Sequence, residues 1–498
     1  MIKKLLVANR GEIAVRIMRS CREIGIRTVA VYSEADRTSM HVRYADEAYL
    51  IGPSPSTESY LKIENIINAA KKSKSDAIHP GYGFLSENTE FAKICGKEGF
   101  IFIGPSPHAI STMGDKISAR KTMIEAGVPV VPGNQSKIVT LEDARNVINQ
   151  IGLPLIVKAS AGGGGKGMRL VEYEEDLMNA ITMARSEAKT AFGDDSVYIE
   201  KYIIEPHHIE FQILGDKFGN IIHLCERECS IQRRHQKVIE ETPSPLLTPE
   251  LREEMGKVAI KAARSVNYEG TGTIEFLVDK KLNYYFLEMN TRLQVEHPIT
   301  ERVVGIDLVK EQIRVANGEQ LIYKQEDIRQ LGHAIECRIY AEDPENNFMP
   351  SPGLIRHISE PRGLGIRTDG YVYPGYEIPI YYDPMISKLI VWARTRYGAI
   401  DRMKRALYEY KISGVKTSIK YLENILKHPV FEEGNYNTHF IETYSSDLKT
   451  NTEPCDFDCE NMAVITAFID YTEKLKKLSV SVPVSKNGYE WRRAGKLW

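Results

Sequence analysis

The 498-residue sequence is poor in cysteine, in excess charge and in long apolar runs. Seven cysteines without a CxxC pair make neither a disulfide framework nor a usual zinc site, so we expect free thiols and a cytoplasmic protein. The 65 basic and 67 acidic side chains leave a formal charge of −2, which gives no electrostatic reason to bind nucleic acid or a membrane. No apolar run reaches the roughly 18 residues of a membrane helix, and the N-terminal apolar run is too short for a secretory signal.

Two common nucleotide signatures are missing where they would be expected. The fingerprint GxGxxG does not follow the first predicted strand, so the fold does not by itself imply NAD. The glycine cluster at 162–165 continues as Lys166-Gly167, whereas a P-loop requires Ser or Thr after the lysine.

The first hundred residues alternate strand and helix patterns. Apolar runs at 4–8, 28–32, 76–79 and 100–103 predict strands, and the segments between them carry amphipathic helix stripes such as Ile13, Ile17, Cys21 and Ile24. This alternation predicts an α/β fold with a parallel, doubly wound sheet, which binds its ligands beyond the carboxyl ends of the strands.

The chain divides into three predicted domains and a tail. We expect an N-terminal domain over 1–113, a strand-rich central domain over 114–331 and a mixed α and β domain over 332–445. The remaining residues, 446–498, contain a polar linker, a short apolar helix at 462–471 and an alternating segment at 478–482.

The glycine cluster is the first candidate site. Each glycine would weaken a helix or strand interior by roughly 0.5–1 kcal/mol relative to alanine, so such a run favours close approach of the backbone to a ligand. Its amides could cradle phosphates, and Lys158 on the preceding strand could pair with one. The alternative is a flexible surface linker.

Two glutamates form the second candidate site. Residues 273–278 and 284–288 are typical of hairpin strands around a short turn, which would bring Glu275 and Glu288 together beside Asn290. Carboxylates in apolar strands need a compensating cation, and oxygen ligands suit Mg²⁺. The alternative is two exposed glutamates on an edge strand.

The third candidate site is the segment 292–298. Arg292, Gln294 and Glu296 alternate, so an extended backbone would point all three side chains one way. A guanidinium beside a carboxylate suits a small planar oxyanion, with the acid orienting it or accepting a proton. The charge run Arg233 to Lys237 adds cations, although such a run alone is more often a solvated face.

Together these motifs resemble the signatures of the biotin carboxylase family of ATP-grasp ligases. The resemblance covers residues 1 to about 445 and rests on VANRGEIAVR, HPGYGFLSEN, KASAGGGGKGM, ERECSIQRRHQKVIEE, EFLVD, FLEMNTRLQVEHPITE and HAIECRIYAEDP, in the family's order. It implies a Rossmann-like N-terminal domain, an ATP-grasp domain with a mobile lid at about 131–203, and a C-terminal domain. The family joins ATP and bicarbonate into carboxyphosphate and then carboxylates N1′ of biotin.

The resemblance also assigns roles to individual residues. ATP would be bound by Lys116, Lys158, Gly164, Gly165, Glu200, Lys201, Tyr202, Ile203, His208, Gln232, His235, Glu275 and Glu288. Mg²⁺ or Mn²⁺ would be held by Glu275, Glu288 and Asn290, and bicarbonate by Lys237, Arg292, Gln294, Val295 and Glu296. Glu296 would act as the base, Arg338 would stabilise the biotin enolate, and Tyr82 would lie near the ureido ring.

Biotin is expected on a separate carrier protein. The carrier signature Ala-Met-Lys-Met is absent, and the nearest string, at 402–405, lies in a helical pattern. The chain therefore resembles a stand-alone biotin carboxylase subunit, expected to be a homodimer that works with carrier and carboxyltransferase subunits. The final acceptor is expected to be pyruvate in preference to acetyl-CoA or propionyl-CoA. The tail would dock a partner through Trp491, Arg492, Arg493 and Trp498, or else pack on its own chain.

Three rival functions remain to be compared with this one. Another ATP-grasp carboxylate–amine ligase would share the phosphate chemistry, but not the RLQVEHP and ECRIYAEDP segments in this form. A catalytically silent assembly subunit should have lost metal or bicarbonate residues, yet Glu288, Asn290, Arg292 and Glu296 are present. A nucleic-acid-binding module is disfavoured by the balanced charge.

Overall fold

The computed structural model describes residues 1–134, 141–159, 168–193, 195–449 and 458–479. Residues 1–449 form one compact unit, and residues 450–498 form a second. The predicted phosphate-loop glycines Gly164 and Gly165 lie outside the described residues, as do the tail residues Trp491 to Trp498.

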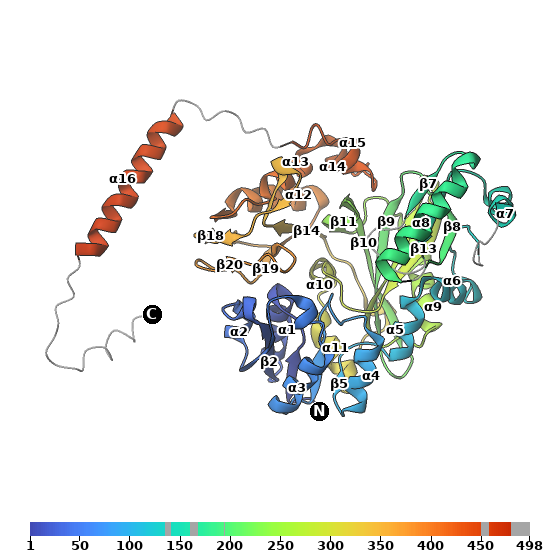
Figure 1. Ribbon diagram of the computed structural model, residues 1–498, viewed down its shortest axis with the longest axis horizontal. Coiled ribbons are helices and arrows are strands. Elements are labelled where there is room, and N and C mark those ends of the chain that lie inside the picture. Colours follow the sequence, from blue (N-terminus) through green and yellow to red (C-terminus); the bar gives the residue numbers. More distant parts are fainter. Residues whose placement is uncertain (135–140, 160–167, 194, 450–457, 480–498) are drawn as a thin grey trace. The chain divides into compact units, whose positions relative to one another are not determined.

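The N-terminal domain confirms the predicted parallel sheet (Figure 1, blue). Its strands lie in the order β3 (Glu47–Gly52), β2 (Arg27–Ser33), β1 (Lys4–Val7), β4 (Ala77–His79) and β5 (Ile101–Phe102), and every neighbouring pair is parallel. The accompanying helices are α1 (Gly11–Glu23), α2 (Met40–Tyr44), α3 (Ile63–Ser73) and α4 (Thr89–Lys97). Strand β3 was not predicted, although Ala48 to Ile51 form a short apolar run; it is an edge strand, and most of its side chains are at least partly exposed.

The expected lid region contains its own small sheet and core. Antiparallel strands lie in the order β7 (Arg169–Val171), β6 (Leu155–Ala159) and β8 (Val197–Lys201), beside α7 (Leu141–Ile151) and α8 (Leu177–Phe192). Buried Leu155, Val157, Ile181 and Ile199 belong to a hydrophobic cluster separate from the other cores. A segment with a separate core can move as a unit, so a mobile lid here stays a prediction that this packing supports.

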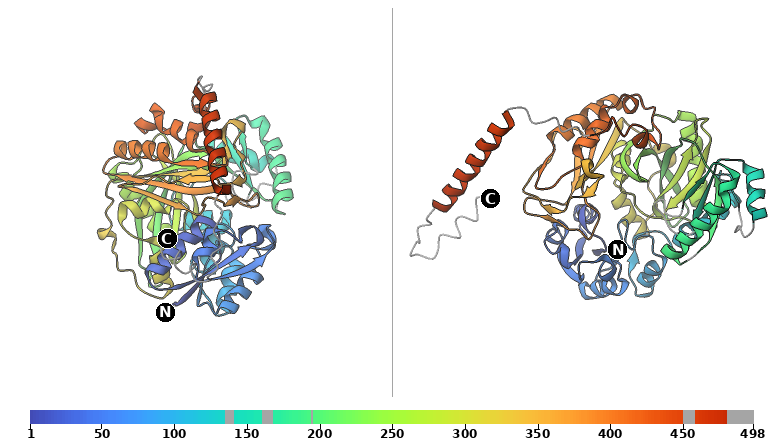
Figure 2. Two further views of the ribbon diagram at one scale, coloured as in Figure 1. Left: turned by 90° about the vertical axis from the view of Figure 1, so that its left-hand side faces the viewer. Right: turned by 45° about the horizontal axis from the view of Figure 1, so that its top comes forward.

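One antiparallel sheet of eight strands runs through both the central and the C-terminal domain (Figure 2). Its order is β13 (Tyr284–Asn290), β12 (Gly270–Val278), β9 (His207–Gly215), β10 (Ile221–Arg233), β11 (Gln236–Thr242), β14 (His333–Tyr340), β21 (Met385–Ala393) and β19 (Ile366–Gly370). The boundary expected near residue 332 thus falls between β11 and β14, which are neighbours in the sheet. The two domains therefore share a continuous backbone scaffold.

Helices cover this sheet and make its cores. The helices of the compact unit after α4, apart from α7 and α8, are α5 (Pro107–Gly114), α6 (Lys116–Glu125), α9 (Pro249–Arg264), α10 (His297–Val304), α11 (Leu308–Ala316), α12 (Arg396–Glu409), α13 (Ile419–Lys427), α14 (Pro429–Glu433) and α15 (Phe440–Thr443). The compact unit also contains three separate two-stranded sheets. They pair β15 (Glu342–Asp343) with β16 (Met349–Pro350), β17 (Gly353–Leu354) with β20 (Glu377–Ile378), and β18 (His357–Ser359) with β22 (Lys411–Ser413). Phe211 and Phe276 pack with Met255 and Ala259 of α9, and α12 and α13 supply a second core behind β14 and β21.

The second unit contains the helix α16 (Asp458–Ser479). The predicted helix at 462–471 was therefore too short: α16 extends to Ser479, into the first two residues of the segment 478–482 that was expected to alternate. No helix in the described part of the chain combines the length and apolar character of a membrane-spanning segment.

Candidate active site

A buried lysine on β11 is the centre of the site. The Lys237 ammonium donates hydrogen bonds to Glu210 at 2.6 Å, Glu296 at 2.7 Å and Glu275 at 2.9 Å. The charge run Arg233 to Lys237, to which this lysine belongs, was expected to be a solvated face more often than not. Only the tight turn at residues 234–235, with positive φ at both positions, and Gln236 are exposed, while the strands on either side bury their charges.

The hairpin of β12 and β13 brings two carboxylates together, as predicted. Glu275 and Glu288 are directly opposite in register, and Asn290 donates to Glu275 at 2.9 Å. Burial favours the protonated form of Glu275, but Lys237 and His208 hold its pKa well below the usual value. Burial and the charge of Glu275 raise the pKa of Glu288. The pair therefore combines one firmly ionised carboxylate with a second whose ionisation a cation would favour.

The donor chemistry of this pair fits a hard divalent cation. Glu275, Glu288 and Asn290 offer only oxygen ligands, which suit Mg²⁺ or Mn²⁺ with substrate phosphates completing the shell. His208, Glu210 and Glu275 also have ligand atoms within 4.8 Å of one another. Because Lys237 is bonded to two of these carboxylates, the metal position consistent with the oxygen set is the Glu275–Glu288 side.

The segment from Arg292 to Glu296 bends at Arg292 and turns at Val295 and Glu296, so it is not the uniformly extended segment that we predicted. Pro298 occupies the first turn of α10, and Glu296 takes the N-cap position. The turn nevertheless gathers the side chains: Arg292 donates to Gln294 at 2.8 Å, and Gln294 donates to Glu275 at 3.1 Å. The predicted convergence is confirmed, although its backbone explanation was wrong.

A buried arginine on β14 lies beside the predicted base. Arg338 donates to Glu240 at 2.7 Å and to Glu296 at 3.0 Å. Burial and Glu210 oppose ionisation of Glu296, but Lys237 and Arg338 lower its pKa below the usual value. Glu296 is thus an anion at neutral pH, positioned between two cations.

The residues predicted for the nucleotide form a second group toward the lid. Lys158 donates to Glu200 at 2.7 Å, and Arg120 donates to the same carboxylate at 2.8 Å. Lys116 interacts electrostatically with carboxylates of both groups. Burial lowers its pKa, and the charges of Glu288 in the first group and Glu200 in the second act against this decrease.

The other predicted nucleotide residues have mixed placements. Gln232 lies 2.8 Å from His208 Nδ1, and His208 Nε2 lies 2.9 Å from Glu275, so this pair joins the metal side of the cluster. Lys201 donates to the Leu153 carbonyl at 2.6 Å, and Tyr202 lies 3.3 Å from His439. Ile203 is the second residue after the end of β8. His235 lies in the exposed turn, away from the buried side chains of this group.

Tyr82 lies in the loop after β4. Its phenol donates to Glu12 of α1, and the same carboxylate lies 3.2 Å from the Lys388 ammonium of β21. Tyr82 therefore belongs to a buried charged group that involves the N-terminal domain.

Several charged residues of the site were missed from the sequence. They are Glu12, Glu87, Glu210, Arg227, Glu240 and Lys388. Glu210 and Lys388 each interrupt an apolar strand, which is the same signal that singled out Glu275. Glu12 and Glu87 lie within the motifs VANRGEIAVR and HPGYGFLSEN, so their presence in a motif was a usable signal as well.

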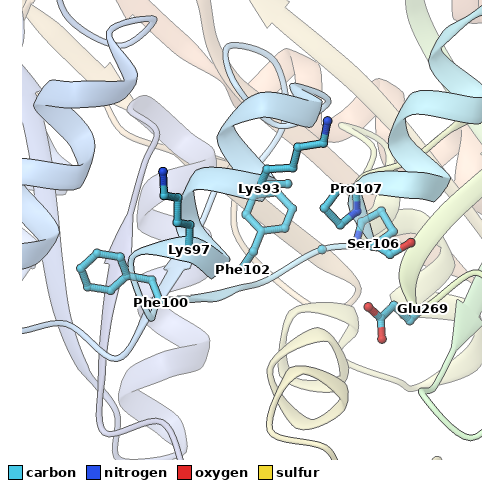
Figure 3. A pocket seen from close by; sticks show the side chains of 11 residues that line it. Lys93, Lys97, Phe100, Phe102, Ser106, Pro107 and Glu269 are labelled. Atoms are coloured by element: carbon cyan, nitrogen blue, oxygen red, sulfur yellow. The ribbon is translucent and has the colours of Figure 1, made fainter.

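A separate cavity of about 280 Å³ lies beside α4 and the loop after β5. Figure 3 shows Lys93 and Lys97 with Phe102 on one side and Glu269 on the other. Lys237 and the charged residues gathered around it, here called the Lys237 cluster (Glu210, Glu240, Glu275, Glu296, Arg227, Arg292 and Arg338), do not line this cavity. The cavity is therefore not where the buried ionisable groups converge.

Comparison with known proteins agrees with this geometry. Family models match residues 1–110 as "Biotin carboxylase, N-terminal domain", 115–324 as "Carbamoyl-phosphate synthase L chain, ATP binding domain" and 336–443 as "Biotin carboxylase C-terminal domain". The central domain is thus of a kind named for an amine-using ligase, whereas the two flanking matches distinguish this chain from that rival.

Relatives and solved structures cover almost the whole compact unit. Biotin carboxylase 1 of Bacillus subtilis is 58% identical over 445 residues, which is 89% of this chain and 99% of the relative. A pyruvate carboxylase subunit of Methanothermobacter thermautotrophicus is 56% identical over 444 residues, covering 89% of this chain and 90% of the relative. The biotin carboxylase domain dimer of the Hydrogenobacter thermophilus 2-oxoglutarate carboxylase, solved with MgADP, ADP and bicarbonate, has a TM-score of 0.86 at 52% identity, covering 90% of this chain and 99% of that one. The chain belongs to the biotin carboxylase family, a group of ATP-grasp ligases.

Proposed function

We propose that this chain uses ATP and bicarbonate to carboxylate biotin on a separate carrier protein, within a multi-subunit carboxylase. The observation that supports it most directly is the Lys237 cluster, in which an ionised Glu296 lies between the cations of Lys237 and Arg338. Arg292 is held beside it by Glu87 and Gln294. This arrangement suits a small oxyanion that must be bound, oriented and deprotonated.

In this mechanism Lys237 and Arg292 bind bicarbonate, with Gln294 and the Val295 backbone completing its pocket. Glu296 takes the bicarbonate proton. A bicarbonate oxygen then attacks the γ-phosphorus of ATP, and the bond to the ADP oxygen breaks to give carboxyphosphate. Lys116 and Lys158 neutralise phosphate charge, which is the main protein contribution to phosphoryl transfer.

Transfer to biotin uses the opposite wall of the site. Arg338 stabilises negative charge on the ureido oxygen of biotin, and Tyr82 lies against the ureido ring. The carboxyl group forms its new bond to N1′ while its bond to phosphate breaks, and the departing phosphate takes the N1′ proton. Carboxyphosphate reacts with water, so closure of the lid at about 131–203 would protect it.

Metal and nucleotide binding complete the proposal. Glu275, Glu288 and Asn290 would hold Mg²⁺ or Mn²⁺, which supplies neutralising charge between the phosphates when it is bound. The remaining nucleotide contacts would come from Gly164, Gly165, Glu200, Lys201, Tyr202, Ile203, His208, Gln232 and His235. His235 would have to enter the site by movement of its turn, since its side chain is exposed.

We propose a homodimer and pyruvate as the final acceptor. The 2-oxoglutarate carboxylase relative was solved as a domain dimer. The Methanothermobacter relative, 56% identical to this chain, is a pyruvate carboxylase subunit, which supports pyruvate. Relatives of similar identity include a mouse methylcrotonoyl-CoA carboxylase protein, so the acceptor is assigned by the carboxyltransferase partner.

The test is ADP release by the purified full chain with Mg²⁺, bicarbonate and free biotin. We expect ADP release to need bicarbonate and to rise with biotin, and labelled bicarbonate to enter biotin. Release driven by amines instead would support the carboxylate–amine ligase. For the acceptor, co-purified subunits are supplied with pyruvate, acetyl-CoA or propionyl-CoA, and incorporation of label into an acyl-CoA alone would contradict the pyruvate proposal.

A further inference from the structure

One completely buried lysine takes no part in the mechanism above. Lys388 on β21 has 0% of its side chain exposed. Its ammonium donates to the Val295 carbonyl at 2.9 Å and lies 3.2 Å from a carboxylate oxygen of Glu12. Burying a lysine this fully is unfavourable unless its charge is compensated, so both contacts are needed for its placement.

The partners of Lys388 come from distant parts of the chain. Glu12 lies in the first turn of α1, whereas Val295 lies in the turn immediately before Glu296. The Tyr82 phenol donates to the other oxygen of Glu12, and the Lys388 ammonium lies 5.9 Å from the centre of the Tyr82 ring. One ammonium therefore connects the N-terminal domain to the backbone that carries the proposed base.

The surrounding charges explain why the ion pair matters. Burial raises the pKa of Glu12 to about 7, and the charge of Lys388 acts against that rise, while Asp369 adds to it and Arg367 opposes it. Glu336 on the adjacent strand β14 is also buried, and neither of its oxygens has a hydrogen-bond partner among the described residues. Without Lys388, Glu12 would be a buried carboxylate with the Tyr82 phenol as its remaining close partner.

We propose that Lys388 is a positioning residue for the transfer of the carboxyl group to biotin. By bonding the Val295 carbonyl and pairing with Glu12, it fixes Glu296 and Tyr82, the two sides between which biotin would lie, at a constant separation. This inference rests on the proposed function. It predicts that loss of Lys388 misaligns biotin while leaving the metal and phosphate residues on β12, β13 and the lid unchanged.

The experiment measures kcat/KM for free biotin and KM for ATP in the full-length Lys388→Met variant. We expect kcat/KM for free biotin to fall about 10–100-fold, since small misplacements of reacting groups have effects of that size. KM for ATP should stay within about two-fold, because the metal and phosphate residues that would bind ATP are not contacted by Lys388. The matched control is Lys416→Met, which removes an exposed lysine paired with Asp343 at 2.7 Å in the same domain.

A second variant separates positioning from folding. The double change Lys388→Met with Glu12→Gln removes both charges, which avoids leaving one buried charge without a partner. The same selective loss in this variant supports the proposal even where the single variant fails to fold. A loss of ATP affinity as large as the loss in kcat/KM for biotin in the folded double variant, or an unchanged kcat/KM for biotin, would overturn it. Absence of biotin-stimulated ADP release in the unaltered chain would instead refute the proposed function itself.

Discussion

Replacing Arg338 by methionine should separate the two halves of the reaction. The guanidinium donates to Glu240 and Glu296 at 2.7 and 3.0 Å, and it is about nine-tenths buried. Loss of one preorganised donor to a developing oxyanion lowers kcat about 10²–10³-fold, so we expect biotin carboxylation to fall by that factor. Bicarbonate-dependent ATP cleavage should fall much less, because Arg338 does not contact the phosphate lysines.

The same substitution should also change the pH dependence of stability. Burial raises the pKa of Glu240 to about 7, and Arg338 is the main group that opposes the rise. A folded-state pKa above the unfolded value means that the contribution of Glu240 to stability is complete at low pH and is lost as pH rises through the folded pKa. Without Arg338 that pKa rises further, so the variant should be destabilised more at about pH 8.5 than at about pH 6.

A matched arginine provides the control. Arg396 pairs with buried Glu241 at 2.8 and 2.9 Å in the same domain but away from the Lys237 cluster. Breaking either buried pair should cost roughly 3–5 kcal/mol, so both variants should have lower urea midpoints by circular dichroism. Only the Arg338 variant should lose carboxylation selectively. Equal loss of carboxylation and ATP cleavage in Arg338→Met would refute the role assigned to Arg338.

Three further predictions follow from the same geometry. Glu296→Ala should abolish biotin carboxylation but change ATP affinity, measured by titration calorimetry, by less than about three-fold, because it removes a base and no phosphate contact; turnover near that of the unaltered chain would contradict this assignment. Glu288→Gln should raise the Mg²⁺ concentration needed for half-maximal ADP release, since one anionic ligand is lost, and an unchanged Mg²⁺ dependence would exclude Glu288 from the metal site. Truncation after Lys449 should leave biotin-dependent ADP release intact, because residues 1–449 form a compact unit, while removing co-purification of the other subunits; retained co-purification would refute docking through the tail.

The parallel sheet was predictable because its inner strands are buried on both sides. Such strands have continuous apolar runs, as at Leu5 to Val7, which the sequence shows directly. The pairing of Glu275 with Glu288 was predictable for a different reason, since the short turn between β12 and β13 restricts their register. The edge strand β3 was missed despite its short apolar run at Ala48 to Ile51.

The burial of Lys237 could not be read from its own segment. Its partner Glu296 is 59 residues away, and Glu210 lies on a different strand, so the local charge run suggested exposure. The turn at Arg292 to Glu296 could have been anticipated, because Pro298 marks the first turn of a helix and an extended segment cannot continue into it. Local sequence therefore predicted which side chains converge better than it predicted the backbone that gathers them.

The distribution of charge suggests how the two halves of the site divide their tasks. In the cluster, carboxylates balance every cation before any substrate enters: Glu210, Glu240, Glu275 and Glu296, with Glu87 and Glu288 beside them, face Lys237, Arg227, Arg292 and Arg338. This balance keeps Glu296 ionised and oriented, yet it leaves little positive charge for a nucleotide. In the proposed reaction the phosphates would therefore be neutralised by Lys116, Lys158 and a bound cation, and Lys158 would exchange its hydrogen bond to Glu200 for a phosphate. Substitutions in the cluster should accordingly change the chemical steps, whereas substitutions on the lid side should change the affinity for ATP.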